Sequence, residues 1–225
     1  MYRVFAINGS PRQDRGNTAM LLNPFLAGLK ENGAEVHQFY ASQLKIKPCT
    51  CGVLYCWNNT PGECIIRDSM EKVYPVLKGA NLVIIATPKY IPLPGDLQNF
   101  INRLCPLLNP ELQFRDGRTR ARLRDDVHIE HFLLVATGGW WEWGNVTTLE
   151  AVVKELAEDA SISYGGTIFR PHAHAMKKNG ELTPGGQKVL DAIRQAASEW
   201  MQMRRISTAT LAEISRPMVS LEGYL

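Results

Sequence analysis

Residues 2–18 read YRVFAINGSPRQDRGNT, and this stretch decides the fold class. Residues 2–8 form an almost continuous apolar run, which is typical of a parallel strand covered on both faces. Residues 9–16 are polar and contain glycine and proline, so they indicate a loop. From Asn17 to Lys30 apolar residues recur at helical spacing, although Pro24 should kink this helix or restart it. A buried strand, a polar loop and an amphipathic helix in this order predict the start of a β–α–β unit.

The rest of the chain continues this alternation of apolar runs and helical patterns. Further strands are predicted at residues 35–40, 82–87, 131–137 and 162–169, and helices at 68–77, 96–105, 147–159 and 184–205. Residues 45–67 are predicted to be irregular, and residues 106–126 to be a polar connection. Five strands with helices between them predict an α/β fold in three layers, a doubly wound five-stranded parallel sheet in the order 2-1-3-4-5.

Three of the predicted helices begin at residues that commonly cap helices. Two of these starts have the spacing of a capping box, and the third places a proline in the first helical position. The pairs are Asp68 with Glu71, Thr147 with Glu150, and Thr183 with Pro184.

The composition of the chain is that of an ordinary globular protein. Of its 225 residues 45% are hydrophobic and 21% charged, which excludes a disordered or fibrous chain. A formal charge of +3 is too small to indicate nucleic-acid binding. The longest apolar runs, 82–86 and 132–136, are far shorter than the ~20 residues that span a bilayer. Because the first residues also lack the features of a signal peptide, a cytoplasmic protein is expected.

The same length predicts one main domain with a short tail. We expect residues 1–205 to form this domain, with 45–67 as an inserted cysteine-rich loop. Residues 206–225 show no strong periodicity, so this tail is expected to pack on the body or at an oligomer interface.

The loop after the first strand has the chemistry of a phosphate site. It joins a buried strand to a helix start, where free backbone N–H groups and the helix dipole favour an anion. No lysine follows its last glycine and no G-x-G-x-x-G is present, so it is neither a P-loop nor a dinucleotide fingerprint. A polar turn that only caps the helix is the alternative. The residues suited to a phosphate monoester are Ser10, Arg12, Gly16, Asn17 and Thr18.

Here the sequence resembles a known family, the flavodoxin-like NADPH-dependent FMN reductases and their relatives, the iron–sulfur flavoproteins. The resemblance covers about residues 1–170 and is most specific in Gly-Ser-Pro-Arg-x-x-x-Gly-Asn-Thr, residues 9–18. It continues through 87–90 (TPKY), 99–103 (NFINR) and 137–139 (TGG). Two departures are Gln98, where many relatives have Lys, and Asn102, where many have Asp.

The resemblance implies an FMN site between three loops. Ser10, Arg12, Gly16, Asn17 and Thr18 would hold the FMN phosphate. The isoalloxazine ring would lie between two further sets, Pro88, Lys89, Tyr90 and Ile91 on one side and Thr137, Gly138, Gly139 and Trp140 on the other. A flat apolar wall and closely approaching backbone suit such a ring, although Tyr90 could instead be a loop aromatic that covers the core.

The implied activity is that of an FMN-dependent oxidoreductase. It would take electrons from NAD(P)H or a reduced carrier and pass them to a quinone, a flavin or an iron–sulfur acceptor. Because hydride transfer to flavin needs no protein acid or base, no catalytic residue is predicted. Two other classes stay open: an electron carrier without turnover of its own, and a non-redox domain that binds a phosphate ligand.

Four of the five cysteines lie in the loop 45–67. Cys49, Cys51, Cys56 and Cys64 give the spacing C-x-C-x₄-C-x₇-C, whereas the iron–sulfur flavoproteins usually have C-x₂-C-x₂-C and a fourth cysteine further on. Four thiolates suit a [4Fe–4S] cluster. A zinc or redox-thiol role and a loop without metal are the alternatives. Cys105 is predicted to be a small core residue.

Three further groups of residues have open roles. The tryptophans at 140, 141 and 143 could close the flavin site or form a subunit contact in a homodimer or homotetramer. His172 and His174 are more typical of a pocket or loop than of a metal site. The arginines between 115 and 124 could grip the extra phosphate of NADPH, but a solvated face is the preferred interpretation.

Overall fold

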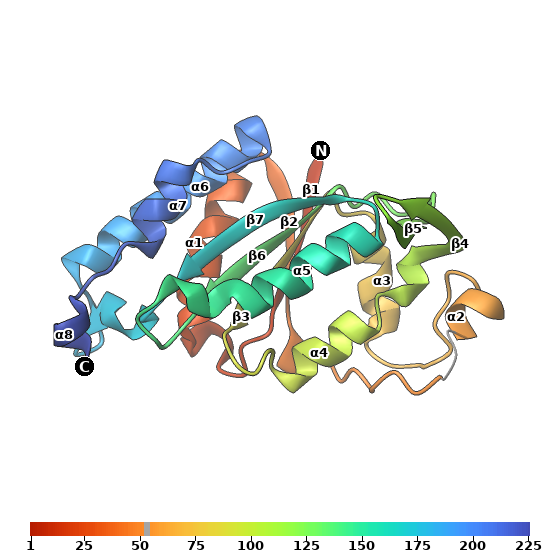
Figure 1. Ribbon diagram of the computed structural model, residues 1–225, viewed down its shortest axis with the longest axis horizontal. Helices are drawn as coiled ribbons and strands as arrows, with labels where there is room; N and C mark the ends of the chain where they lie inside the picture. Colours follow the sequence, from red (N-terminus) through yellow and green to blue (C-terminus); the bar gives the residue numbers. More distant parts are fainter. Residues whose placement is uncertain (52–54) are drawn as a thin grey trace.

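The computed structural model of the chain describes residues 1–51 and 55–225. Its centre is a five-stranded parallel sheet in the order β2-β1-β3-β6-β7 (Figure 1). The strands are β1 (Tyr2–Asn8), β2 (Ala34–Tyr40), β3 (Leu82–Pro88), β6 (His131–Thr137) and β7 (Ser163–Arg170). Counted along the chain, this is the flavodoxin-like order 2-1-3-4-5, so the predicted fold class is confirmed.

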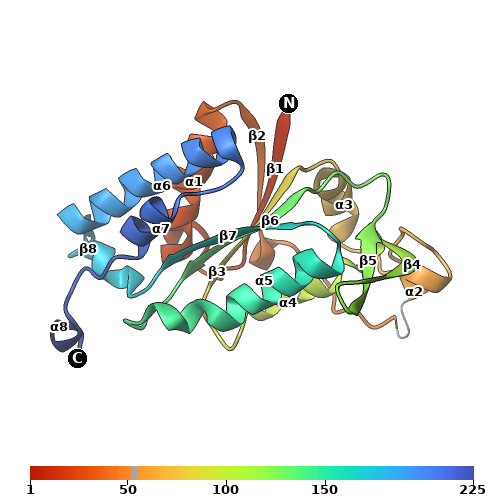
Figure 2. The same cartoon turned by 45° about the horizontal axis from the view of Figure 1, so that its top comes forward.

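Helices cover both faces of this sheet (Figures 1 and 2). One face carries α1 (Asn17–Glu31) and α6 (Pro184–Met203), with α7 (Thr208–Ser215) packed beside α6. The other face carries α3 (Met70–Lys78), α4 (Gly95–Asn102) and α5 (Thr147–Asp159). Helix α1 runs through Pro24 without a restart.

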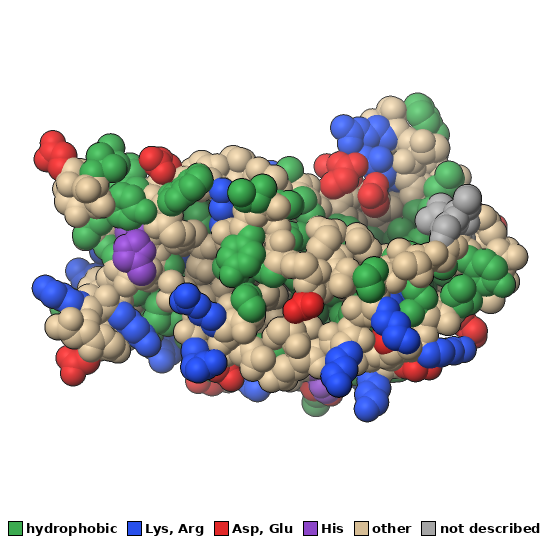
Figure 3. Space-filling view, turned by 90° about the horizontal axis from the view of Figure 1, so that it is seen from below, with side chains coloured by type: hydrophobic (Ala, Val, Ile, Leu, Met, Phe, Trp, Pro, Cys, Tyr) green, Lys and Arg blue, Asp and Glu red, His purple; other side chains and the backbone are tan. Residues whose placement is uncertain are grey.

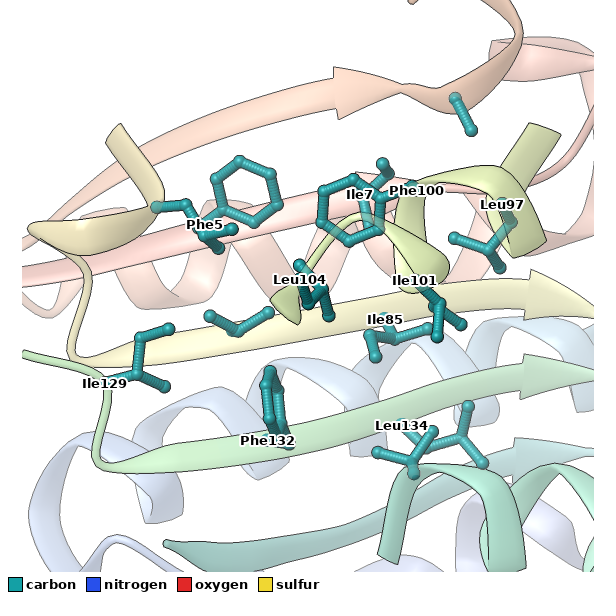
Figure 4. Packing of buried hydrophobic residues seen from close by; sticks show 14 of the residues in the cluster. Phe5, Ile7, Ile85, Leu97, Phe100, Ile101, Leu104, Ile129, Phe132 and Leu134 are labelled. Atoms are coloured by element: carbon teal, nitrogen blue, oxygen red, sulfur yellow. The ribbon is translucent and has the colours of Figure 1, made fainter. Parts of the chain in front are cut away.

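The alternation of side chains along each strand fills the two cores. In β1, Phe5 and Ile7 face α3, α4 and α5, whereas Val4 and Ala6 face α1 and α6. The rings of Phe5 and Phe100 stack with centroids 5.8 Å apart, and Figure 4 shows them among the aliphatic side chains of this core. Because both faces are buried, most positions of the central strands β1, β3 and β6 are apolar, which explains the continuous runs in the sequence.

The predicted polar connection at residues 106–126 is wrong. The strands β4 (Leu108–Arg115) and β5 (Arg118–Leu123) form an antiparallel hairpin there. The turn residues Asp116 and Gly117 both have positive φ, at 51° and 78°, as a two-residue hairpin turn requires. The Asp-Gly pair was the sequence signal for this hairpin. The strands on either side contain many charged residues, so their pattern of apolar and polar residues did not indicate strands.

Two arginines of this hairpin, Arg118 and Arg120, pair with acidic residues of α5. Arg120 contacts Glu155 at 3.1 Å and Glu158 at 3.4 Å, and Arg118 contacts Glu155 at 3.4 Å. The side chain of Arg120 is only 11% exposed, so it belongs to an ion-pair network rather than to a freely solvated face.

Several short elements complete the chain. The C-terminal tail is more regular than predicted, since it contains α7 and α8 (Leu221–Tyr224). No helix among the described residues is long and apolar enough to cross a membrane. The remaining short elements are η1 (Gln13–Arg15), η2 (Ala41–Gln43), α2 (Tyr55–Asn58), η3 (Cys105–Leu107), η4 (Trp143–Val146), η5 (Ala173–Met176), β8 (Lys177–Lys178) and β9 (Glu181–Leu182).

The predicted helix caps have mixed outcomes. The Thr183 hydroxyl accepts a hydrogen bond from the Gly186 N–H, so this cap is confirmed. The capping box of Thr147 is wrong: Thr147 lies inside the helix and donates to the Gly144 carbonyl. Its expected partner Glu150 instead accepts a hydrogen bond from Thr167 on β7.

The predicted capping box of Asp68 and Glu71 is wrong: the N-cap of α3 is Ser69, without a side-chain cap, and Glu71 pairs with Arg67. Asp68 makes other contacts. It accepts hydrogen bonds from the backbone of Met70 and Lys47, and it forms a bidentate ion pair with Arg103 at 2.7 and 3.3 Å. Both side chains are buried, at 3% and 1% exposure. Arg103 also donates to the carbonyls of Lys47 and Ile66, so the pair ties together the two ends of the cysteine-rich loop. We call Asp68 and Arg103 the loop clamp.

Asp68→Asn should destabilise the protein by about 3–5 kcal/mol near neutral pH, because it leaves the Arg103 charge buried without its partner. Burial alone would raise the pKa of Asp68, but the hydrogen bonds from Arg103, Met70 and Lys47 outweigh it and lower that pKa. The stabilisation is therefore present above the ordinary Asp pKa of ~4 and is lost as pH falls through the lower folded value.

Urea unfolding of the wild type and of Asp68→Asn at several pH values between acid and neutral measures the difference in their free energies of unfolding. This difference should become smaller in acid. The control is Glu71→Gln, which breaks the exposed pair between Arg67 and Glu71 and should cost under about 1 kcal/mol. Equal effects of the two substitutions would contradict the role of the loop clamp.

Candidate functional site

Three loops meet where β1, β3 and β6 end. In the parallel register Asn8 lies beside Ala86, and Pro88 beside Thr137. The Gly9 N–H donates to the Ala86 carbonyl at 2.7 Å, and the Lys89 N–H donates to the Thr137 carbonyl at 2.7 Å. The structure thus brings the three predicted segments of the site to one edge of the sheet.

The loop 9–16 folds into a tight turn around Ser10. The Ser10 N–H donates to Asn8 Oδ1 at 2.9 Å, and the Arg12 N–H donates to Ser10 Oγ at 3.3 Å. A Cβ on Gly16 would lie 2.6 Å from Ser10 Oγ, so any side chain there would displace the buried Ser10 hydroxyl. This close approach explains why glycine precedes Asn17.

The start of α1 is open to an anion. Its N-cap is Gly16, which has no side chain to cap the helix, and the first N–H groups of a helix lack intrahelical partners. The Asn8 side chain beneath the loop is fully buried, and its Nδ2 has no partner among the described residues. Arg12 is exposed and forms no ion pair within residues 1–51 and 55–225. These donors and this charge fit a phosphate group.

An acidic neighbour of this loop is already engaged. Asp14 accepts hydrogen bonds from the Tyr40 hydroxyl and from the Asn23 amide. Burial, and then the hydrogen bond and charge of Asp14, raise the pKa of Tyr40 to about 12. Tyr40 therefore stays protonated as the donor, and this bond holds the carboxylate against β2.

A pocket of about 230 Å³ opens between the other two loops. The Lys89 ammonium lies 4.4 Å from the centroid of the Trp140 ring. Tyr90, Ile91 and Trp140 are exposed at 47%, 97% and 60%, which is unusual for such large apolar side chains. Figure 3 shows the molecule from below, with a group of hydrophobic side chains near the middle of the view and most Lys and Arg along its lower part. The pocket is lined by Lys89, Tyr90, Ile91, Gly138, Gly139, Trp140 and Asn145.

Six of these seven lining residues are among those predicted, and Asn145 is the one that sequence reasoning missed. It lies in η4, and its amide donates to Glu142. Its position in the loop after β6 was the available signal. Pro88 and Thr137 lie at the strand ends behind the pocket rather than in its lining.

The backbone of the loop after β6 presents donors at the pocket. The Gly138 N–H donates to Arg170, the Gly138 carbonyl accepts from Ala173, and the Trp140 carbonyl accepts from His172. Among the described residues, no acceptor is recorded for the N–H groups of Gly139 and Trp140. A ring with carbonyl and ring-nitrogen acceptors could therefore bind these two N–H groups.

A buried hydrogen bond connects the anion loop to the pocket. The hydroxyls of Thr18 and Thr137 lie 3.0 Å apart, and both side chains are almost fully buried. The Thr18 hydroxyl is thus occupied by Thr137, which leaves its backbone N–H at the helix start for an anion.

The cysteines group differently from the prediction. All five are free thiols, and the Sγ atoms of Cys49 and Cys51 lie 3.5 Å apart. Cys56 and Cys105 lie close enough for each to affect the pKa of the other thiol, and the Trp57 indole donates to the Cys105 carbonyl at 3.2 Å. Cys105 therefore belongs with the cysteine-rich loop and is more than a core residue. Burial, and then the charge of Cys56, raise the pKa of the Cys105 thiol.

Cys64 lies near the side chain of Tyr74. Burial, and to a lesser extent the charge of Cys64, raise the pKa of the Cys56 thiol. Within the described part of the chain, no three His, Cys, Asp or Glu side chains are arranged to hold a metal ion. Residues 52–54, which belong to the predicted loop, lie outside the described residues. The sulfur donors have the chemistry that a cluster needs, but the described thiols do not form a closed site.

Comparison with known proteins identifies the family. The model of the family described as NADPH-dependent FMN reductase matches residues 2–140. An iron–sulfur flavoprotein of Methanocaldococcus jannaschii is 41% identical over 169 residues, which are 74% of this chain and 77% of that protein. An iron–sulfur flavoprotein of Archaeoglobus fulgidus is 33% identical over 106 residues, 46% of each chain.

Solved structures share the fold at low sequence identity. An FMN-dependent NADH-azoreductase from Bacillus anthracis, in complex with FMN, has a TM-score of 0.61 at 17% identity and covers 89% of this chain and 100% of its own. An NAD(P)H:quinone oxidoreductase from Methanothermobacter marburgensis has a TM-score of 0.58 at 12% identity, with 91% and 99% covered. Together with the family match over more than half of the sequence, these findings show that the chain belongs to the family of NADPH-dependent FMN reductases.

Proposed function

We propose that the chain binds FMN with its phosphate at the start of α1 and its ring in the pocket between the loops after β3 and β6. The family is one of NAD(P)H-dependent, FMN-using oxidoreductases. The observation that carries the proposal is the meeting of an uncapped helix start with an apolar pocket at one sheet edge. The fully buried Asn8, whose amide nitrogen lacks a partner among the described residues, also supports a ligand at this edge.

Each part of the site has a distinct task in this proposal. Ser10, Arg12 and the N–H groups of Asn17 and Thr18 would neutralise and hold the phosphate. Gly16 allows the chain to approach it. In the ring pocket, Tyr90 and Trp140 would exclude water, while the N–H groups of Gly139 and Trp140 would donate to ring acceptors.

Bound FMN would accept a hydride from the nicotinamide and pass electrons on, which is the chemistry of the cofactor itself. The chain's residues bind and orient the reactants, and none needs to move a proton. The pocket is bordered by exposed apolar side chains, which suit a flat nicotinamide and a flat acceptor such as a quinone or a second flavin. We infer a cytoplasmic protein in which a second subunit covers part of these apolar side chains.

An iron–sulfur cluster is the second part of the proposal. The relatives named iron–sulfur flavoproteins and the grouping of thiols near α2 support it. Cys49, Cys51 and Cys56 would supply three thiolates, and the fourth would come from Cys64 or from Cys105. With a cluster, the chain would pass electrons between FMN and an external carrier. The alternative to the oxidoreductase is then an electron carrier that turns over no small molecule of its own.

Replacing Ser10 and Arg12 by alanine together should weaken FMN binding about 10- to 100-fold, because hydrogen bonds to a charged phosphate contribute about 1.5–3 kcal/mol. Fluorescence titration of the FMN-free protein measures this affinity. The matched control is Arg15→Ala, which removes an exposed arginine of the same turn that is outside the proposed site. If the double variant binds FMN as tightly as this control, the phosphate assignment is wrong.

Cys56→Ala should abolish bound iron in protein that is purified and reconstituted without oxygen. Comparing Cys64→Ser with Cys105→Ser identifies the fourth ligand, since only the variant that loses a ligand should show reduced iron and sulfide per chain. Iron retained at the wild-type level in the Cys56 variant would refute the cluster.

A further inference from the structure

The C-terminal tail returns to the loop that borders the ring pocket. The Tyr224 hydroxyl donates to the Gly139 carbonyl at 2.9 Å, and the Trp141 indole donates to the Val219 carbonyl at 2.9 Å. Both Figures 1 and 2 show α8 at the end of the molecule where this loop lies. The last residues of the chain therefore hold the backbone beside the pocket.

A buried arginine anchors the tail. Arg170, the last residue of β7, is fully buried and donates to the carbonyls of Ile214 at 2.8 Å and Arg216 at 2.7 Å. It also donates to the Pro171 carbonyl and to His172 Nε2. No carboxylate is among these partners. Burial, and then the charge of Arg216, lower the pKa of Arg170 to about 10, so it remains charged at neutral pH.

His172 completes the anchor. Its Nε2 faces two donors, the Arg170 guanidinium at 2.7 Å and the Met218 N–H at 3.1 Å. A ring nitrogen that accepts two hydrogen bonds must be unprotonated, so His172 is neutral with its proton on Nδ1. Burial and the charge of Arg170 lower the pKa of His172, in agreement with this state. The ring of Trp141 stacks on His172 with centroids 6.4 Å apart.

The same residues fix the pocket loop from the other side. The backbone after β7 binds Gly138 and Trp140, as described above, and Tyr224 binds the carbonyl that lies between them. In a planar trans peptide the C=O and N–H point in opposite directions. Holding the Gly139 carbonyl toward the tail therefore directs the Trp140 N–H away from the tail.

We propose that residues 216–224 are part of the flavin site, as a strap that Arg170 and His172 anchor and whose Tyr224 orients the Gly139–Trp140 peptide for the ring. Tyr224 is thus a positioning residue. This inference rests on the FMN placement proposed above. Neither the family match, which ends at residue 140, nor the resemblance of residues 1–170 assigns a role to this tail.

Tyr224→Phe removes only the hydroxyl that binds Gly139. The FMN dissociation constant should rise about 2- to 10-fold, the range for one hydrogen bond of about 0.5–1.5 kcal/mol. The absorption band of the saturated, bound flavin and its midpoint potential should also shift, because the donor at the ring is displaced. The control is Glu222→Gln, an exposed residue of the same helix without an ion pair in the described chain, and it should match the wild type.

His172→Asn gives a second readout that does not need FMN. His172 has a left-handed backbone conformation with φ of 35°, which asparagine tolerates, but asparagine lacks the Nε2 acceptor. Amide exchange of residues 138–141, 214–216 and 218 should become faster in this FMN-free variant than in the wild type.

Three outcomes distinguish the strap proposal from the FMN placement on which it rests. Weaker binding and a shifted band in Tyr224→Phe, with Glu222→Gln unchanged, support the strap. Wild-type affinity, band and potential in Tyr224→Phe overturn it even if FMN binds as proposed. If the wild type binds no FMN, the FMN placement fails, and faster exchange in His172→Asn would show a tail contact that serves no flavin site.

Discussion

The parallel register of β1, β3 and β6 is the constraint on which the site depends. It places Asn8 beside Ala86 and Pro88 beside Thr137, so the loops that follow these strands leave the sheet at one edge. A slip of one residue would turn the apolar side chains of a strand to the opposite face and move its loop. Both faces of the sheet are buried against helices, so packing in the two cores fixes the register. The register in turn fixes the positions of the three loops that form the site.

Two buried arginines extend this order to segments that lie outside the sheet. Arg103 binds Asp68 and two carbonyls at the ends of the cysteine-rich loop. Arg170 binds carbonyls of the tail and His172, with no carboxylate among its partners in the described part of the chain. In each case one guanidinium, which offers five donors, binds several backbone carbonyls of a segment outside the sheet. These side-chain contacts add to the short helices of the cysteine-rich loop and the tail in ordering both segments.

The sequence predicted those features that burial imposes locally. The strands were predicted because parallel strands between two helical layers are mostly apolar. Gly16 was predicted only as part of the loop motif, and the structure adds that a side chain there would displace the Ser10 hydroxyl. The hairpin at 108–123 was missed although Asp116-Gly117 is a typical hairpin turn. Its strands contain many charged residues and few apolar ones, so they lack the apolar–polar alternation by which a strand is recognised. The predicted capping box of Thr147 is absent because the Glu150 carboxylate instead accepts a hydrogen bond from Thr167 on β7.

Other features could not be predicted, because they join residues that are distant in sequence. The contact between Cys56 and Cys105 depends on α2 packing against η3, and that between Tyr224 and Gly139 depends on the path of the tail. Neither pair has a spacing rule that a single sequence would reveal. Six of the seven residues that line the pocket belong to the set implied by the family resemblance, and the meeting of their loops follows from the order of the parallel strands.

The most direct test of the account is an absorption spectrum of the protein purified without oxygen, recorded before and after NADPH is added. The account predicts flavin bands that correspond to one FMN per chain, that survive desalting and that bleach on reduction. A broad iron–sulfur shoulder that bleaches with them would support the cluster as well. A protein that stays colourless after incubation with FMN and desalting would contradict the proposed site.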